Sequence, residues 1–332
     1  MRATTTSAVI LQYHHISNTT PAATSVTTER FAEHLAYIDA HFTVLPLDEL
    51  MNLLQQGKAL PENSVAITFD DGYLNILEQG HPLLTKHGFP YTIFVNPAYV
   101  GARKNLLTWQ QLKQMSKEGA LIANHYLAHE HLLYQAEFKD DSDWLEDHRM
   151  NIHLAEEIIV DQIGHSPRFI AYPYGEYDSR LQDLLKQMNI AGFAQHSGAI
   201  SANSDLTAIP RYPASGVYSN LKTLKTKMHS LAFPVQSNSI SNPKLATDGI
   251  AQPIKLEVDL SDIYPSQVAC YYGGESLEIT WEDSVFTIQQ NKPYPTGRSR
   301  VNCTAPSKTM AKRYYWFSQP FFVPTAAGDW PD

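Results

Sequence analysis

The chain has 332 residues, of which 43% are hydrophobic and 18% charged, and its formal net charge is −9. This length allows one large domain or two, and the composition is that of an ordinary globular protein. The acidic balance argues against a nucleic-acid partner, because no basic stripe is available to neutralise phosphates. No apolar run approaches the roughly 20 residues that a membrane-spanning helix needs.

Most of the chain alternates short apolar strands with amphipathic helices. Strands are predicted at 8–13, 42–47, 64–69, 91–96, 121–125, 169–175 and 192–196. Helices are predicted at 27–42 behind a threonine cap, after Asp48, near 75–87, after Thr108, at 145–163 and at 179–189. We expect Asp48 and Thr108 to cap their helices. The alternation indicates a parallel α/β architecture, either barrel-like or doubly wound.

The pattern changes after a last predicted helix within 220–233. A polar stretch rich in serine and asparagine at 235–249 is typical of a linker. Beyond it, short alternating segments separated by turn residues predict a small β-sandwich of about 80 residues. We therefore expect an α/β domain at 1–234, a linker at 235–249 and a small β domain at 250–332.

Two features bear on the compartment of the protein. The N-terminus lacks the long apolar segment of a signal peptide, so either the protein stays in the cytoplasm or a signal is removed before this sequence begins. Cys270 and Cys303 both lie in the last third of the chain. One disulfide and two separate buried thiols are equally good expectations at this point.

The stretch ITFDDGY at 67–73 ends a predicted buried strand with two adjacent acids. Like charges there repel and lose hydration, so the pair is unfavourable without compensation. Gly72 permits a bend that lets both acids address one site. A divalent metal would offset the charge, with Asp71 as a ligand and Asp70 held ionised nearby as a base. The alternative is a turn or helix cap made of two solvated acids.

A second cluster, NHYLAHEHLL at 124–133, is rich in histidine. His125 and His129 are four residues apart, and in a helical turn both imidazoles would lie on one side. His125 follows a predicted strand, so it should emerge at the same edge as the acids. Two histidines and one carboxylate, with other positions open to water, form a catalytic metal set. His131 is a further candidate, and the alternative is a polar loop.

Two further motifs follow the same logic. His14, which we prefer to His15 because it is nearer the end of its strand, could serve as a general acid. Arg211, flanked by prolines in IPRYP, could pair with Asp70. The AYPYG turn at 171–175 could direct backbone N–H groups at an oxyanion. The alternatives are a surface histidine and simple turn structure.

With TFDDG, HxxxH and YPYG in this order, the first 230 or so residues resemble the polysaccharide deacetylases of the NodB-homology family, which are carbohydrate esterases. This resemblance implies a distorted (β/α) barrel and a divalent metal, usually zinc. The first acid of TFDDG is the catalytic base in that family, which implies this role for Asp70. The second acid and the two histidines hold the metal, which implies that Asp71, His125 and His129 are its ligands.

The details resemble the branch of poly-N-acetylglucosamine deacetylases, in which the barrel is circularly permuted and an N-terminal strand supplies the acid. This resemblance implies that His14 is the general acid. Two positions depart from the family pattern. Ala171 stands where other members have arginine, so that Arg211 takes its role or the role is absent. Tyr126 stands where serine or threonine is usual.

The function that the resemblance implies is metal-dependent hydrolysis of the N-acetyl group on a glycan containing N-acetylglucosamine. Asp70 would take a proton from water, His14 would protonate the departing amine, and a backbone amide near Tyr174 would help to hold the oxyanion. The alternatives are a metal-dependent amidase acting on a small non-glycan amide and a glycan-binding protein without activity. Glycans of this kind lie outside the cytoplasm, which favours a periplasmic or secreted protein.

The predicted β domain lies outside the resemblance. Its aromatic residues could contact glycan, although aromatic residues more often fill the core of a sandwich. The candidates are Tyr271, Tyr272, Trp281 and Trp316.

Overall fold

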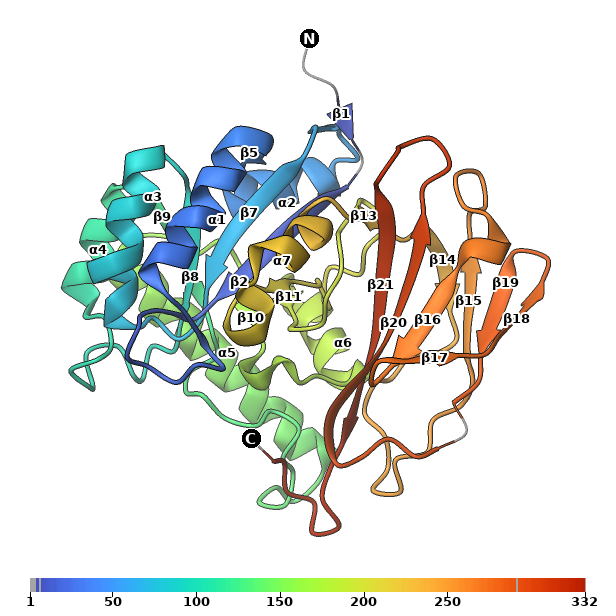
Figure 1. The fold of residues 1–332 in the computed structure, drawn as a ribbon. Helices are drawn as coiled ribbons and strands as arrows, with labels where there is room; N and C mark the ends of the chain where they lie inside the picture. Colours follow the sequence, from blue (N-terminus) through green and yellow to red (C-terminus); the bar gives the residue numbers. More distant parts are fainter. Residues whose placement is uncertain (1–3, 6, 291, 332) are drawn as a thin grey trace.

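The fold, seen in a computed structural model, is described for residues 4–5, 7–290 and 292–331. A parallel sheet in its N-terminal part curves into a barrel-like layer with helices around its outside (Figure 1). In spatial order its strands are β11 (Ala191–Phe193), β10 (Phe169–Ala171), β9 (Ala120–Asn124), β8 (Tyr91–Val95), β7 (Ser64–Phe69), β2 (Ala8–Tyr13) and β12 (Tyr212–Pro213). This is the distorted (β/α) barrel that the sequence predicted.

Backbone pairing brings the two ends of the sheet together. β2 and β7 are aligned from Ala8 opposite Ser64 to Tyr13 opposite Phe69, and β5 (Thr43–Val44) pairs with the first residues of β7. The Arg211 N–H donates to the His196 carbonyl at 3.0 Å, which joins the segment before β12 to the segment after β11. The carboxyl ends of the parallel strands therefore meet at one rim, where such folds place their sites.

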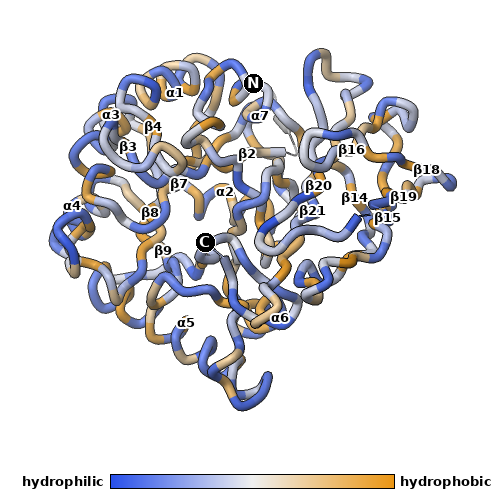
Figure 2. The backbone as a smooth tube through the Cα atoms, turned by 60° about the horizontal axis from the view of Figure 1, so that its bottom comes forward, coloured by the Kyte–Doolittle hydropathy of each residue, from blue (hydrophilic) through white to orange (hydrophobic). Residues whose placement is uncertain are grey.

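The helices of this part are α1 (Thr28–His41), α2 (Leu47–Gln55), α3 (His81–His87), α4 (Trp109–Lys117), α5 (Asp141–Ile163), α6 (Ser179–Met188) and α7 (Leu221–Met228). A π-helical turn, η1 (Ile76–Gly80), precedes α3. Hydrophobic residues concentrate along the strands, and hydrophilic residues along the outer loops (Figure 2). Among the described residues, no helix combines the length and apolarity that crossing a bilayer requires.

The predicted helix caps have different outcomes. Thr108 is confirmed as the N-cap of α4, where it and Gln111 form a reciprocal capping box. The cap expected at Asp48 is wrong, because α2 already begins at Leu47 behind Pro46. Asp48 instead lies in the first turn, where its negative charge is favourable near the positive end of the helix dipole.

The C-terminal part consists of two sheets whose strands are mostly antiparallel. One contains β13 (Leu231–Ala232), β21 (Tyr314–Val323), β20 (Gly297–Pro306), β16 (Ala269–Tyr272) and β17 (Glu275–Leu277). The other contains β14 (Val235–Asn238), β15 (Ile254–Val258), β19 (Val285–Ile288) and β18 (Ile279–Glu282). Both sheets contribute to one apolar core that includes Leu256, Phe286 and Phe321, so the sandwich-like arrangement is present.

Two findings refine the expected organisation of this part. Residues Val235–Asn238, placed in the predicted linker, form an edge strand paired with β15, so this piece belongs to the β structure. β13, within the predicted catalytic domain, pairs with β21 of the C-terminal part. The domain boundaries themselves stay a prediction. Cys270 and Cys303 lie opposite each other on β16 and β20 and form a disulfide, which resolves the alternatives left open by the sequence.

Candidate functional site

The strand carrying the acid pair ends in a sharp turn. β7 stops at Phe69, and Asp71 and Gly72 both adopt left-handed backbone conformations, with φ of 70° and 68°. A Cβ at position 72 would lie 3.1 Å from the Val95 side chain, so the turn favours glycine for space as well as conformation. The aspartate at left-handed φ is a strained position of the kind that concentrates at functional sites. The turn aims both carboxylates at one site.

Asp71, His125 and His129 converge as the sequence predicted. The Asp71 Oδ1 atom lies 3.1 Å from His125 Nε2 and 3.6 Å from His129 Nε2. All three candidate ligand atoms lie within 4.8 Å of one another. The helical turn expected between the histidines is wrong, because residues 125–129 form a loop and Tyr126 has a φ of 68°. The loop, rather than helical periodicity, brings the two imidazoles together.

The residues present fit a divalent cation. Asp71 Oδ1 and His125 Nε2 are buried and, apart from facing each other at 3.1 Å, have no hydrogen-bond partner among the described residues, which is costly unless another group binds them. Two ligands bound at about 2.1 Å around a tetrahedral ion lie about 3.4 Å apart, close to the two separations from Asp71 Oδ1. His125 Nδ1 donates to the Ala171 carbonyl at 2.8 Å, so Nε2 is the nitrogen of the neutral ring that can bind a metal, and it faces Asp71 Oδ1.

The protonation states of Asp71 and His129 agree with this fit. Burial lowers the pKa of His125, but the Asp71 and Asp70 carboxylates raise it more, and the net pKa lies above its usual range. Burial raises the pKa of Asp71, but the neighbouring histidines lower it more, and the net pKa lies below its usual range. Burial, followed by the charge of His125, lowers the pKa of His129 to about 4. An ionised carboxylate and a neutral imidazole are the forms that a metal requires.

Asp70 is fully buried and held by a dense set of donors. Arg211 is also buried and donates from Nη1 to Oδ1 at 2.7 Å and from Nη2 to Oδ2 at 2.8 Å. Gln12 donates to Oδ2 at 2.7 Å, and His14 Nε2 lies 3.9 Å from the same oxygen. Burial raises the pKa of Asp70, but Arg211, His125 and His14 together lower it more, to about 2. Asp70 is therefore an ionised carboxylate of low basicity beside the metal set.

The two departures from the family pattern have structural counterparts. Arg211 reaches Asp70 from the segment before β12, and the pairing expected from the sequence is present. Ala171 contributes its carbonyl to His125 instead of a side chain to the site. Tyr126 points into the core, where its hydroxyl lies 2.8 Å from His148 Nδ1. It therefore takes no part in the cavity wall.

Tyr174 and His131 border the metal set. Tyr174 has a φ of 55°, and its ring lies edge-on to His129 with centroids 4.4 Å apart. His131 stacks on the Tyr174 ring at 3.9 Å, and its Nδ1 lies 2.9 Å from Glu176 Oε2. His131, the further ligand candidate, therefore lies outside the group of converging atoms. His15 stacks on Tyr73, with its Nδ1 2.9 Å from Asn75 Nδ2, while His14 lines the cavity.

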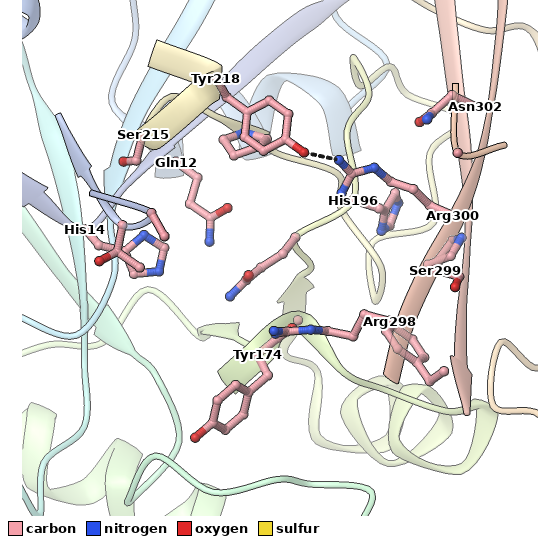
Figure 3. A pocket seen from close by; sticks show the side chains of 18 of the residues that line it. Gln12, His14, Tyr174, His196, Ser215, Tyr218, Arg298, Ser299, Arg300 and Asn302 are labelled. Carbon is pink, nitrogen blue, oxygen red and sulfur yellow. Dashed lines mark hydrogen bonds between the residues drawn. The ribbon is translucent and has the colours of Figure 1, made fainter. Parts of the chain in front are cut away.

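A cavity of about 1010 Å³ opens over this set and is lined by both parts of the chain. Figure 3 shows His14 on one side of it, and Arg298 and Arg300 extending from β20 on the other. Tyr272 also lines the cavity, whereas Trp281 packs against Phe286 in the sandwich. The C-terminal part is therefore a wall of the site.

Sequence reasoning missed three residues of this site. Gln12 was hidden within the apolar run AVILQY, although it is two residues before His14 and thus on the same side of an extended chain. A lone polar residue at the end of a buried strand was the available signal. The sequence around Arg298 and Arg300 gave no such signal, because their position at the cavity depends on how the β sheet packs against the barrel.

Comparisons with known proteins agree on the family of the barrel. Residues 57–193 match the model of the polysaccharide deacetylase family. YxkH of Bacillus subtilis strain 168, assigned to the polysaccharide deacetylases, is 28% identical over 211 residues, covering 62% of this chain and 71% of that protein. The poly-β-1,6-N-acetyl-D-glucosamine N-deacetylase of Escherichia coli K12 is 21% identical over 222 residues, covering 56% of this chain and 33% of that protein.

Solved structures support the same fold. The Streptococcus pyogenes deacetylase PplD, in complex with acetate, has a TM-score of 0.60 at 21% identity, covering 69% of this chain and 99% of that one. IcaB from Ammonifex degensii has a TM-score of 0.58 at 19% identity, with coverages of 69% and 99%. Residues 57–193 of the present chain are therefore similar in sequence to polysaccharide deacetylases, and its barrel shares the fold of solved deacetylases.

Proposed function

We propose that this protein is a metal-dependent N-deacetylase that removes acetyl groups from a glycan containing N-acetylglucosamine. The observation that carries the proposal is the convergence of Asp71, His125 and His129 beside Asp70 and His14 in one large cavity. The names of the relatives support this substrate class, since one acts on poly-β-1,6-N-acetyl-D-glucosamine and another on peptidoglycan N-acetylglucosamine.

Asp71, His125 and His129 would hold the cation, and Zn²⁺ is the metal that best suits two imidazoles and one carboxylate. When bound, a cation of this kind lowers the pKa of a water molecule and stabilises negative charge on an amide oxygen. The low pKa of Asp70 is consistent with a cation that acidifies the water. A carboxylate with a pKa of about 2 accepts a proton readily only from a water molecule whose own pKa has been lowered.

The chain's own residues would move the protons. Asp70 accepts a proton as the water oxygen bonds to the acetamide carbon. The backbone at Tyr174 borders the position of the developing oxyanion. His14 donates a proton to the nitrogen as the C–N bond breaks, leaving acetate and a free amine. Arg211 and Gln12 keep Asp70 ionised and fixed in orientation.

The compartment follows from the substrate and from the disulfide. Disulfides persist in oxidising environments, and Cys270 is bonded to Cys303. N-acetylated polysaccharides of cell walls and biofilms lie outside the cytoplasm. We therefore infer a periplasmic or secreted location. The division into a catalytic domain at 1–234 and an accessory β domain at 250–332 is likewise our proposal, with the accessory domain contacting the glycan.

The test is acetate release from chitin oligomers, poly-N-acetylglucosamine and peptidoglycan, with small acetamides as the competing substrate class. We expect release from at least one glycan, its loss after treatment with a chelator, and its recovery when Zn²⁺ is restored. Release from small acetamides with none from the glycans would overturn the glycan assignment. Glycan binding without release in the presence of metal would overturn the enzymatic one.

A further inference from the structure

The wall formed by β20 brings two arginines to the cavity. Arg298, Arg300 and Asn302 are alternate residues of this strand, so they project from the same side of the sheet, and all three line the cavity. Figure 3 shows the two guanidinium groups reaching from the strand toward Tyr174 and Tyr218. The face of β20 that borders the cavity therefore carries two charged side chains, where a sheet face packed against another domain usually carries apolar ones.

Among the described residues, these arginines form hydrogen bonds with uncharged groups. Arg298 Nη1 donates to the Tyr174 carbonyl at 2.8 Å, and Arg300 Nη2 donates to the Tyr218 hydroxyl at 3.1 Å. Within the part of the chain that the structure describes, no carboxylate lies within 4.0 Å of either guanidinium. Asp71 is the one acidic residue among the described residues lining the cavity, and the proposed metal would occupy it.

A third cation adds to this positive charge. The Lys227 Nζ atom lies 4.6 Å from the Tyr218 ring centroid, and Arg300 Cζ lies 5.8 Å from the same centroid. Burial and then the charge of Arg300 lower the pKa of Lys227 to about 8. Two cations beside one ring form a local positive region in a chain of net charge −9, and such a region attracts an anionic ligand.

The positive wall adjoins the reaction centre. Arg298 contacts the backbone of Tyr174, whose ring in turn contacts the His129 ring. A ligand group held by Arg298 and Arg300 would therefore belong to the same bound glycan as the acetamide under attack. Arg298 is exposed and Arg300 half-buried, so both donors are accessible to a substrate.

We propose, on the basis of the deacetylase function above, that Arg298 and Arg300 select N-acetylated glycans carrying a carboxylate or phosphate on a sugar next to the hydrolysed acetamide. The planar guanidinium offers paired donors that match either anion in a bidentate arrangement. The C-terminal β part is thus a specificity element of the catalytic site.

The experiment compares three substrates of one linkage: chitotetraose, its C6-carboxylate form and its C6-phosphate form. Acetate release gives kcat/KM for each. We expect one charged form or both to exceed the neutral oligomer by about 10- to 100-fold, as suits one or two charge-assisted hydrogen bonds. The preference should shrink at high ionic strength. The relative rates of the two charged forms distinguish a carboxylate site from a phosphate site.

Variants of Arg298 and Arg300 test whether these two residues cause the preference for charged oligomers. In the Arg298→Gln/Arg300→Gln variant the ratio of charged to neutral kcat/KM should fall toward 1, while Arg298→Lys/Arg300→Lys should keep part of it. Taking the ratio within each variant cancels any general disturbance of Tyr174. Lys255→Gln, which removes an exposed positive charge from the other sheet, should keep the full ratio.

Two outcomes would overturn the inference while leaving the proposed function intact. One is release of acetate from the neutral oligomer at the same kcat/KM as from both charged forms. The other is an unchanged ratio in the glutamine double variant. Absence of acetate from every glycan would instead count against the deacetylase function itself.

Discussion

The barrel and the C-terminal β part carry their charged residues in different ways. The barrel holds its acid pair and its histidines where strands end, with Asp70 and Arg211 fully buried and bonded to each other. The β part presents Arg298 and Arg300 near the start of β20, partly open to solvent and without an acidic partner among the described residues. The difference teaches that one cavity combines a buried side, whose charges pair within the protein, with a more exposed side whose arginines we propose to pair with a ligand.

This contrast has an energetic basis. Desolvating both members of an ion pair costs several kcal/mol for each ion, so a buried pair persists only with good geometry and further hydrogen bonds. Asp70 has that geometry through Arg211 and Gln12. Cations near solvent pay little of this cost, and they keep their donors available. Substitutions should therefore separate the two sides.

The largest expected effect is on the reactive side. Asp70→Asn should reduce kcat by about 10²- to 10⁴-fold, because the proton acceptor is lost, while metal remains bound. Acetate release and metal content of the purified variant measure both effects. Asp48→Asn, an exposed change on α2, is the control and should match the wild type. An Asp70→Asn variant with most of its activity would remove Asp70 from the role of base.

The next effect concerns stability. Arg211→Met should lower the free energy of unfolding by about 3–5 kcal/mol, because it leaves the buried Asp70 carboxylate unpaired. Arg298→Met should change it by about 0.5 kcal/mol or less, because that side chain is exposed. Urea denaturation of the two variants beside the wild type measures the difference. Equal losses for both would contradict the contrast between the two sides.

A smaller effect belongs to the β part alone. Cys270→Ser/Cys303→Ser should lower its stability by about 2–4 kcal/mol, because the bridge restricts the unfolded chain across a separation of 33 residues. Thermal unfolding of the double variant, beside reduced and oxidised wild type, checks this. An unfolding temperature of the double variant equal to that of the oxidised wild type would show that the disulfide does not contribute to stability.

The smallest effect tests a local feature of the barrel. Thr108→Ala removes the hydroxyl of the capping box that begins α4 and should cost about 1 kcal/mol. Denaturant midpoints compared with those of Ser116→Ala, a change near the end of the same helix, measure it. A decrease in the free energy of unfolding no greater than that of Ser116→Ala would mean that the capping hydroxyl does not stabilise the protein.

Much of the barrel side could be predicted from the sequence. Apolar runs such as 64–69 and 91–96 located the strands, and the polar residues directly after them located the rim. The site was predictable because strand ends fix where adjacent side chains emerge. The helical turn at 125–129 was wrong because spacing alone does not distinguish a turn of helix from a loop folded around a site.

For the C-terminal β part, the sequence predicted the presence of strands but not how they pair or which residues face the cavity. Residues Val235–Asn238 look like linker in isolation, because an edge strand with exposed residues is defined by its partner β15 rather than by its own pattern. Arg298 and Arg300 carry no local signal for the same reason. Their position over the cavity depends on packing between segments more than a hundred residues apart, as in the contact of Arg298 with Tyr174.

The central claim is that one divalent cation joins the acid of one strand end to the histidines of another. Titration of Zn²⁺ into metal-stripped protein, followed by calorimetry, tests it most directly. We predict one tightly bound ion per chain in the wild type and in His131→Ala, and none in His125→Ala. Undiminished zinc binding by His125→Ala, or no binding by the wild type, would contradict the account.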